Sequence, residues 1–174
     1  MKEIEIIHEW GGKTFTTEYV RRAVRAIIWM DDKILLVYSA GKGDYKFPGG
    51  GIEDGESPED ALTREVLEEC GVTLSGIGGR VIRATEKRQS MHSGDELFTM
   101  VSDYYICTCG QGMVRQNLDP YEKDLGFEPR WIELEKALEE NRALSAAGMG
   151  GDIPWLDREI KVMEALIPGN APRK

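Results

Sequence analysis

The apolar residues of the chain fall into short runs separated by polar turns, a pattern typical of β-strands. Residues 3–8 and 19–30 are rich in Ile, Val and aromatic side chains, and the second run is followed by Asp31-Asp32 and the apolar segment 33–38. Two such runs around a short polar turn predict a β-hairpin. Four further strands are predicted, over residues 72–74, 79–87, 97–109 and 130–134.

A helix is predicted to begin at Ser57 and to end at Cys70. The Ser57 side chain can accept a hydrogen bond from the amides of the first turn, and Pro58 suits the first helical position. Gly71 can take the left-handed conformation that ends a helix. Both ends of this helix are therefore specified by local residues.

Less regular segments lie on both sides of the last predicted strand. Residues 110–129 contain Gly, Pro, Asn and Asp without a clear period, which predicts a long loop. After that strand, residues 135–141 are expected to form one or two helical turns. Residues 143–151, with small side chains and several glycines, are expected to form a flexible link.

A final helix is predicted after this link. Asp152 can cap it, Pro154 lies in its first turn, and apolar residues line one side. Trp155 on this helix is a candidate contact for a homodimer. Pro168 ends the helix, and residues 168–174 are expected to be a disordered tail.

Length and composition narrow the class of protein. A chain of 174 residues fits one domain, so residues 1–174 are interpreted as a single unit. The 31 acidic residues outnumber the 22 Lys and Arg residues, giving a net charge of -9, which argues against binding to nucleic acid or anionic lipid. No signal peptide and no run long enough to span a bilayer is evident, so a cytoplasmic protein without a membrane segment is expected.

Three carboxylates of the predicted helix point to metal chemistry. At about 100° per residue, Glu65, Glu68 and Glu69 share one narrow stripe. Like charges on adjacent turns repel, and Mg²⁺, which prefers oxygen ligands, would remove that cost. The opposite face is expected to pack on a sheet through Leu62, Val66, Leu67 and Cys70. A glutamate-rich surface helix remains the alternative from these residues alone.

The spacing around the helix resembles the signature box of the Nudix hydrolases at every fixed position. From Gly50 there are five residues to Glu56, seven more to Arg64-Glu65, then an aliphatic residue, one residue, Glu68-Glu69, one residue and Gly71. The resemblance implies an α/β fold of the Nudix type, an α/β/α sandwich with a mixed β-sheet between helices. It also implies Mg²⁺- or Mn²⁺-dependent attack of water on phosphorus in a nucleoside diphosphate linked to another group.

The family's functional residues carry over onto matching positions. Metal ligands are implied at Glu65, Glu68 and Glu69, with the carbonyl of Gly50 as a further ligand. Arg64 would orient these acids by hydrogen bonds, braced by Glu56.

The resemblance leaves the general base open. It is a box acid, Glu68 or Glu69, or an acid from a downstream loop. Glu128, which precedes Pro129 and the last strand, is the first candidate outside the box, ahead of Glu122 and Glu96.

The substrate is predicted to be a small nucleotide. ADP-ribose hydrolases of the family tend to carry a proline shortly after the box, and dinucleoside polyphosphate hydrolases carry a tyrosine slightly further on. Residues 87–90, Lys-Arg-Gln-Ser, carry neither marker, which favours a nucleoside triphosphate. Candidates for stacking on a base are Tyr45, Phe47, Tyr121 and Trp131. A noncatalytic nucleotide sensor on the same fold is the alternative function.

Overall fold

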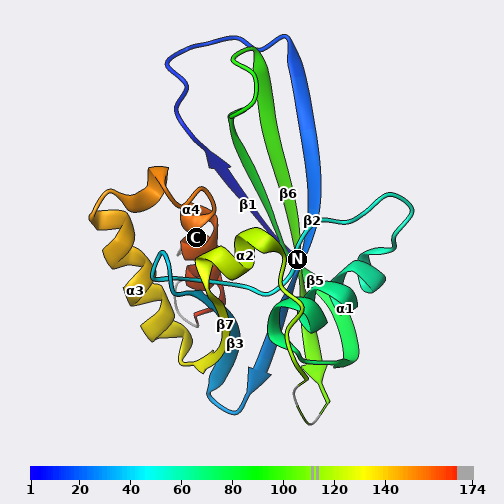
Figure 1. The fold of residues 1–174 in the computed structure, drawn as a ribbon. Coiled ribbons are helices and arrows are strands. Elements are labelled where there is room, and N and C mark those ends of the chain that lie inside the picture. Colours follow the sequence, from blue (N-terminus) through cyan, green and yellow to red (C-terminus); the bar gives the residue numbers. More distant parts are fainter. Residues whose placement is uncertain (111, 113, 168–174) are drawn as a thin grey trace.

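A mixed β-sheet with helices on both faces forms the protein in the computed structural model, which describes residues 1–110, 112 and 114–167 (Figure 1). The strands are β1 (Lys2–Ile7), β2 (Thr17–Met30), β3 (Lys33–Ser39), β4 (Asp44–Lys46), β5 (Leu74–Gln89), β6 (Glu96–Cys109) and β7 (Phe127–Ile132). The helices are α1 (Pro58–Cys70), α2 (Pro120–Leu125), α3 (Leu134–Ala146), the 3-10 turn η1 (Met149–Gly151) and α4 (Leu156–Leu166).

The strands are ordered β1-β5-β6-β2-β3-β4, and β7 pairs with β3. The β1–β5 and β2–β6 pairs are parallel, whereas the other neighbouring pairs are antiparallel, so the sheet is mixed as expected. The predicted hairpin is confirmed between β2 and β3, although only two residue pairs join these strands. Figure 1 shows β2, β5 and β6 extending well beyond the helices.

Alternating residues of the central strands send side chains into two separate cores. Ile27 of β2 packs with residues of α3 and α4, whereas its neighbours Ala26 and Ile28 pack with residues of α1. This alternation follows from the two-residue period of a strand. The predicted α/β/α sandwich is thereby confirmed.

Helix α1 forms where the local residues predicted it. The Ser57 hydroxyl accepts a hydrogen bond from the Asp60 amide, and Gly71 ends the helix in the left-handed conformation at φ 66°. One expectation about its faces is wrong, because Leu67 is 38% exposed while Glu69 is only 1% exposed. The buried face is centred nearer to Glu69 than to Leu67.

Several expected boundaries are also wrong. Residues 110–129 are not all loop, because Asp119 and Glu122 form a capping box that starts α2. The strand expected at 79–87 runs without a break through 74–89, with register shifts close to its glycines. Helix α3 continues to Ala146, into the expected flexible link.

The last helix begins later than predicted. Asp152 ends the turn η1, and α4 begins at Leu156 after Trp155. The predicted tail at 168–174 lies outside the described residues. In the described part of the chain, no helix has the length and apolar character needed to cross a bilayer.

Candidate active site

The glycine turn at residues 49–51 lies between β2 and α1. The Gly50 carbonyl accepts a hydrogen bond from the Val24 amide at 3.0 Å, and the Arg25 guanidinium donates to the Gly49 carbonyl. A Cβ atom on Gly50 would clash with the Glu65 carboxylate. The absence of a side chain at Gly50 therefore lets the turn approach the acids of α1.

Arg64 holds the acids of the box in place. Its Nε and Nη2 atoms donate to the two carboxylate oxygens of Glu56 at 2.8 and 2.9 Å. Its Nη1 atom lies 2.8 Å from Oε1 of Glu65 and 3.3 Å from Oε2 of Glu68. The hydrogen bonds from Arg64 lower the pKa of Glu56 to about 2, so that carboxylate stays charged and keeps Arg64 oriented.

Glu69 has both carboxylate oxygens engaged by the protein. Oε1 lies 2.6 Å from the ammonium of Lys46, and Oε2 accepts a hydrogen bond from the Gly49 amide at 2.8 Å. The Lys46 ammonium also lies 4.0 Å from the centre of the Phe127 ring. Glu69 therefore fixes the glycine turn as well as belonging to the acid cluster.

Burial changes the acidity of two carboxyl groups next to this turn. The pKa of Glu65 is raised by burial, with the negative charge of Glu69 adding to the rise and Arg64 opposing it. The pKa of Glu122 is also raised by burial, against the hydrogen bond from the Asp119 amide. Both groups take up a proton more readily than an exposed glutamate does.

Helix α2 brings a second acidic segment to α1. The Asn117 amide donates to the Glu68 carbonyl at 2.9 Å, which anchors the chain just before α2 to the end of α1. The side chains of Asp119, Tyr121 and Glu122 then line a cavity next to the box.

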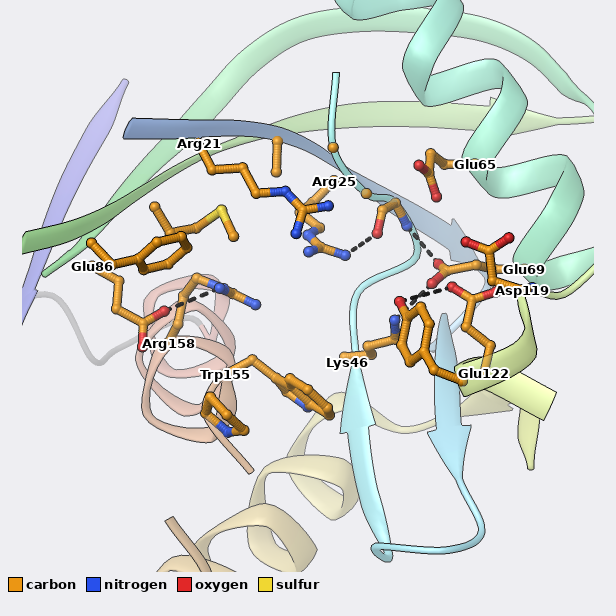
Figure 2. Close-up of a pocket in the computed structure, with 18 of the residues that line it drawn as sticks. Arg21, Arg25, Lys46, Glu65, Glu69, Glu86, Asp119, Glu122, Trp155 and Arg158 are labelled. Atoms are coloured by element: carbon orange, nitrogen blue, oxygen red, sulfur yellow. Dashed lines mark hydrogen bonds and ion pairs between the residues drawn. The ribbon is translucent and has the colours of Figure 1, made fainter. Parts of the chain in front are cut away.

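This central cavity, of about 310 Å³, is polar at one end and partly apolar at the other. Figure 2 shows Glu65, Glu69, Asp119 and Glu122 grouped on one side, with Trp155 and Arg158 across the cavity. Arg21 lies between the two groups, with its guanidinium beside Gly51. A neighbouring recess is lined by Arg64 and Glu68 and shares Glu65, Asp119 and Glu122 with the central cavity.

The predicted site residues are thus only partly brought together. Gly50, Arg64, Glu65, Glu68 and Glu69 gather around the two adjoining cavities.

Glu128 does not line either cavity; it is exposed on β7 and pairs with Arg130 at 2.8 Å. Glu122, which ranked below Glu128 in the sequence, occupies the place expected for a downstream acid. Its capping box with Asp119 was visible in the sequence as Asp-Pro followed by Glu, the pattern of a helix start.

Most of the aromatic residues proposed to stack on a base do not line the central cavity either. Only Tyr121 among them lines the central cavity, because Tyr45 and Phe47 are core residues and Trp131 lines a separate surface groove. Trp155, which the sequence suggested as a homodimer contact, lies half-buried in the cavity wall.

The donor chemistry fits a hard divalent cation. Carboxylate oxygens of Glu65, Glu68, Glu69 and Glu122 surround the adjoining cavities, and the Gly50 carbonyl keeps a second lone pair beside its hydrogen bond. Within residues 1–110, 112 and 114–167, no three acidic, His or Cys side chains already converge on one ion-sized point. Mg²⁺ commonly binds through one or two carboxylates and keeps its water, so the residues fit such an ion.

Comparison with known proteins agrees with this geometry. The family model for the NUDIX domain matches residues 20–151, which is most of the chain. The chain is a member of the Nudix family. Members of this family generally use divalent metal ions, in keeping with the oxygen donors described above.

Two solved structures share the Nudix fold with this chain. A NUDIX hydrolase from Nitrosomonas europaea superimposes with a TM-score of 0.52 at 24% identity, covering 71% of this chain and 79% of that one. A MutT NUDIX hydrolase from Burkholderia pseudomallei gives a TM-score of 0.51 at 23% identity, with coverages of 67% and 85%.

Curated relatives match more locally. The uncharacterized Nudix hydrolase YvcI of Bacillus subtilis is 33% identical over 92 residues, covering 50% of this chain and 56% of that protein. Diphosphoinositol polyphosphate phosphohydrolase 3-alpha of Mus musculus is 31% identical over 111 residues, with coverages of 62% and 59%. The RNA pyrophosphohydrolase of Vibrio cholerae is 58% identical over 37 residues, 22% of its length. This Nudix chain thus spans less than two thirds of these relatives.

Proposed function

We propose that this Nudix protein hydrolyses a phosphoanhydride bond in a small nucleotide, with a nucleoside triphosphate as the first candidate. The observation that carries the proposal is that Glu65, Glu69 and Glu122 lie at one end of the central cavity, whose other end carries cationic side chains. Arg64 and Glu68 line the adjoining recess. An anionic substrate can span the two ends only if a cation offsets the acids. The curated relatives named above for RNA and diphosphoinositol polyphosphates support the phosphoanhydride chemistry.

Each residue has a defined task in this proposal. Glu65, Glu68 and Glu69 would hold Mg²⁺ or Mn²⁺, together with the Gly50 carbonyl. A bound ion of this kind neutralises charge on phosphoryl oxygens and lowers the pKa of an attacking water. Arg64 keeps the ligand carboxylates oriented through its bonds to Glu56 and to the acids themselves.

Glu122 is assigned to accept the proton of the attacking water. It is buried, it lines both adjoining cavities, and its raised pKa makes it a stronger base than an ordinary glutamate once ionised. Lys46 and Arg25, which line the cavity between the acids and its far end, favour the negative charge that develops on the phosphoryl oxygens.

A product-release screen tests the proposal. The substrates are nucleoside triphosphates, sugar nucleotides, ADP-ribose, dinucleoside polyphosphates and an inositol pyrophosphate, each with Mg²⁺, Mn²⁺ or a chelator. We expect metal-dependent turnover of the nucleoside triphosphates, with oxygen from labelled water in one phosphate product. Glu68→Gln is expected to lose most turnover and keep its fold, whereas Glu139→Gln, at an exposed position on α3, keeps full activity.

Two results would contradict the proposed activity. Full turnover in Glu68→Gln would remove the assigned metal site. Tight nucleotide binding without any turnover over the whole panel would favour the noncatalytic sensor instead.

A further inference from the structure

The central cavity has an end away from the acids that phosphoanhydride cleavage alone does not require. We name this end the distal subsite and define it by Arg88, Phe98, Met100, Pro154 and Trp155. Arg21 lies between this subsite and the acids, with its guanidinium beside Gly51 of the glycine turn. Pro154 and Trp155 precede α4 and lie beyond residue 151, where the match to the family model ends. This part of the wall is therefore supplied by a segment outside the matched region.

Trp155 is held in a fixed orientation. Its indole Nε1 donates to Oδ2 of Asp44 at 2.6 Å, and Asp44 has no exposed surface. Because the only polar atom of the indole is already used, Trp155 can offer a ligand in the cavity only carbon surface. Figure 2 shows this side chain across the cavity from the acid cluster.

The facing wall is built by three neighbouring strands. Phe98 and Met100 lie on the same face of β6, Arg88 of β5 pairs in register with Phe98, and Arg21 of β2 pairs in register with Met100. The Arg88 guanidinium lies 4.5 Å from the centre of the Phe98 ring. Aromatic carbon surface and positive charge thus alternate across this face.

The charges of Arg21 and Arg88 are not neutralised by an ion pair within the described part of the chain. Neither guanidinium makes a hydrogen bond to a residue that the structure describes, although that of Arg88 lies over the Phe98 ring. Arg158 behind them differs, since it is bonded to Glu86 at 3.1 Å and to Glu159 at 2.9 Å. Arg21 and Arg88 therefore keep donors available for an anion, beside surfaces suited to a flat ring.

We propose that the distal subsite binds the base and an adjacent phosphate of a nucleotide, and so selects nucleotides over inositol pyrophosphates. This inference rests on the proposed phosphoanhydride hydrolysis. A base can lie against Trp155 and Phe98 while its phosphate meets Arg21 and Arg88. An inositol polyphosphate has no aromatic face, and the phosphates that Arg21 and Arg88 do not contact would lie against Met100, Pro154 and Trp155 without partners.

The size of the cavity favours a mononucleotide over a dinucleotide. Ligand pockets range from roughly 300 to 1,000 Å³, and the volume of about 310 Å³ is at the small end. One base with its sugar and phosphates suits this space better than two linked nucleosides do.

A matched pair of substrates tests the inference. A nucleoside triphosphate and ribose 5-triphosphate share the phosphate chain and differ only in the base. Trp155→Leu and Phe98→Leu are each expected to raise KM for the nucleotide about tenfold with kcat unchanged, and to leave the base-free substrate unaffected. Arg88→Met is expected to raise KM for both substrates, because it removes a contact to phosphate. Trp29→Leu, at a tryptophan outside this cavity, is the control.

A binding measurement separates this inference from the proposed activity. Calorimetric titration with an α,β-methylene nucleoside triphosphate in Mg²⁺ reports on the subsite without cleavage of the α–β bond, and circular dichroism checks that each variant is folded. We expect weaker binding in Trp155→Leu and Phe98→Leu and wild-type binding in Trp29→Leu. Three results would overturn the inference: equal losses on both triphosphates in Trp155→Leu and Phe98→Leu, unchanged nucleotide binding in both of these folded variants, or better turnover of an inositol pyrophosphate by the wild type. An inactive wild-type protein that still binds the nucleotide through Trp155 would contradict only the hydrolysis.

Discussion

The ammonium of Lys46 lies 2.6 Å from Oε1 of Glu69, with the two side chains only 8% and 2% exposed. A carboxylate expected to bind a metal thus has a positively charged partner supplied by the protein. Replacing Lys46 by Met would leave the Glu69 carboxylate buried, with the Gly49 amide as its one remaining partner among the described residues. Removing one partner of a buried pair costs about 3–5 kcal/mol.

We therefore expect Lys46→Met to lower the free energy of unfolding in chelator by about 3–5 kcal/mol. Added Mg²⁺ should restore part of the loss, because a divalent ion can replace the ammonium beside Glu69. Urea unfolding with and without Mg²⁺ measures both effects. Arg142→Met is the control, since Arg142 and Glu164 form an exposed pair worth about 0–1 kcal/mol. Unchanged stability of Lys46→Met in chelator would contradict this account.

Glu122 and Glu128 provide a direct test of which downstream acid serves the reaction. Because Glu122 lines both cavities and Glu128 is exposed beside Arg130, we expect Glu122→Gln to lower kcat by about 100-fold or more. Glu128→Gln should retain wild-type kcat and KM. Steady-state kinetics on the substrate found in the screen measures the difference. A large loss in Glu128→Gln alone would return the role to the residue that the sequence favoured.

The contrast between these two acids shows what the sequence could specify. The ends of α1 were predictable because Ser57, Pro58 and Gly71 start and end the helix through contacts with residues no more than about one helical turn away. The position of Glu122 depends on a contact far along the chain, in which the Asn117 amide bonds to the Glu68 carbonyl. No local pattern reports that contact.

The helical wheel of α1 was informative but incomplete. It placed the three acids on one stripe and most of the apolar residues on another. It did not fix how far the helix is rotated against the sheet. Glu69 lies about 40° from Glu65 and Leu67 about 200°, and the structure buries the side nearer to Glu69. The rotation is set by Lys46 and the glycine turn, which satisfy the Glu69 carboxylate inside the protein.

The late start of α4 has a similar cause. Asp152 and Pro154 are ordinary helix-start residues, and they favoured a helix from that point. In the structure Trp155 is bonded to Asp44, and the chain forms a turn before the helix begins at Leu156. Such a tertiary hydrogen bond overrides local preference.

Gly50 tests how closely the turn must approach the acids. Gly50→Ala would place a methyl group against the Glu65 carboxylate, and Glu65 or the turn must then move. Because displacement of a reacting group by about 1 Å costs about 100-fold in rate, a loss of this order in kcat/KM is expected. The thermal midpoint and the metal dependence of turnover should be measured beside the rate.

Gly79→Ala is the matched control, because a Cβ atom at Gly79 meets no heavy atom within 4 Å. It is also a glycine-to-alanine change that adds one methyl group, and it should keep wild-type kcat/KM. Wild-type activity in Gly50→Ala would show that the close approach of the turn to Glu65 is not needed.

Asp44 makes stability depend on pH in a direction that follows from its burial. Burial raises the pKa of its carboxyl group, which accepts one hydrogen bond from Trp155 through Oδ2, while Oδ1 has no partner among the described residues. The folded protein therefore binds this proton up to a higher pH than the unfolded chain does. Its stabilising contribution is complete below the ordinary carboxyl pKa and is lost as pH rises through the raised value.

Asp44→Asn keeps an oxygen for Trp155 and removes the charge. We expect the variant to be more stable than the wild type at about pH 8, and the difference to shrink as pH falls to about 4, where the wild-type carboxyl is protonated too. Urea unfolding across this range measures the difference in the free energy of unfolding. Asp152→Asn, at an exposed position on the neighbouring turn, serves as the control without burial. A difference that stays constant with pH would mean that burial of the Asp44 charge does not set the stability of this wall of the cavity.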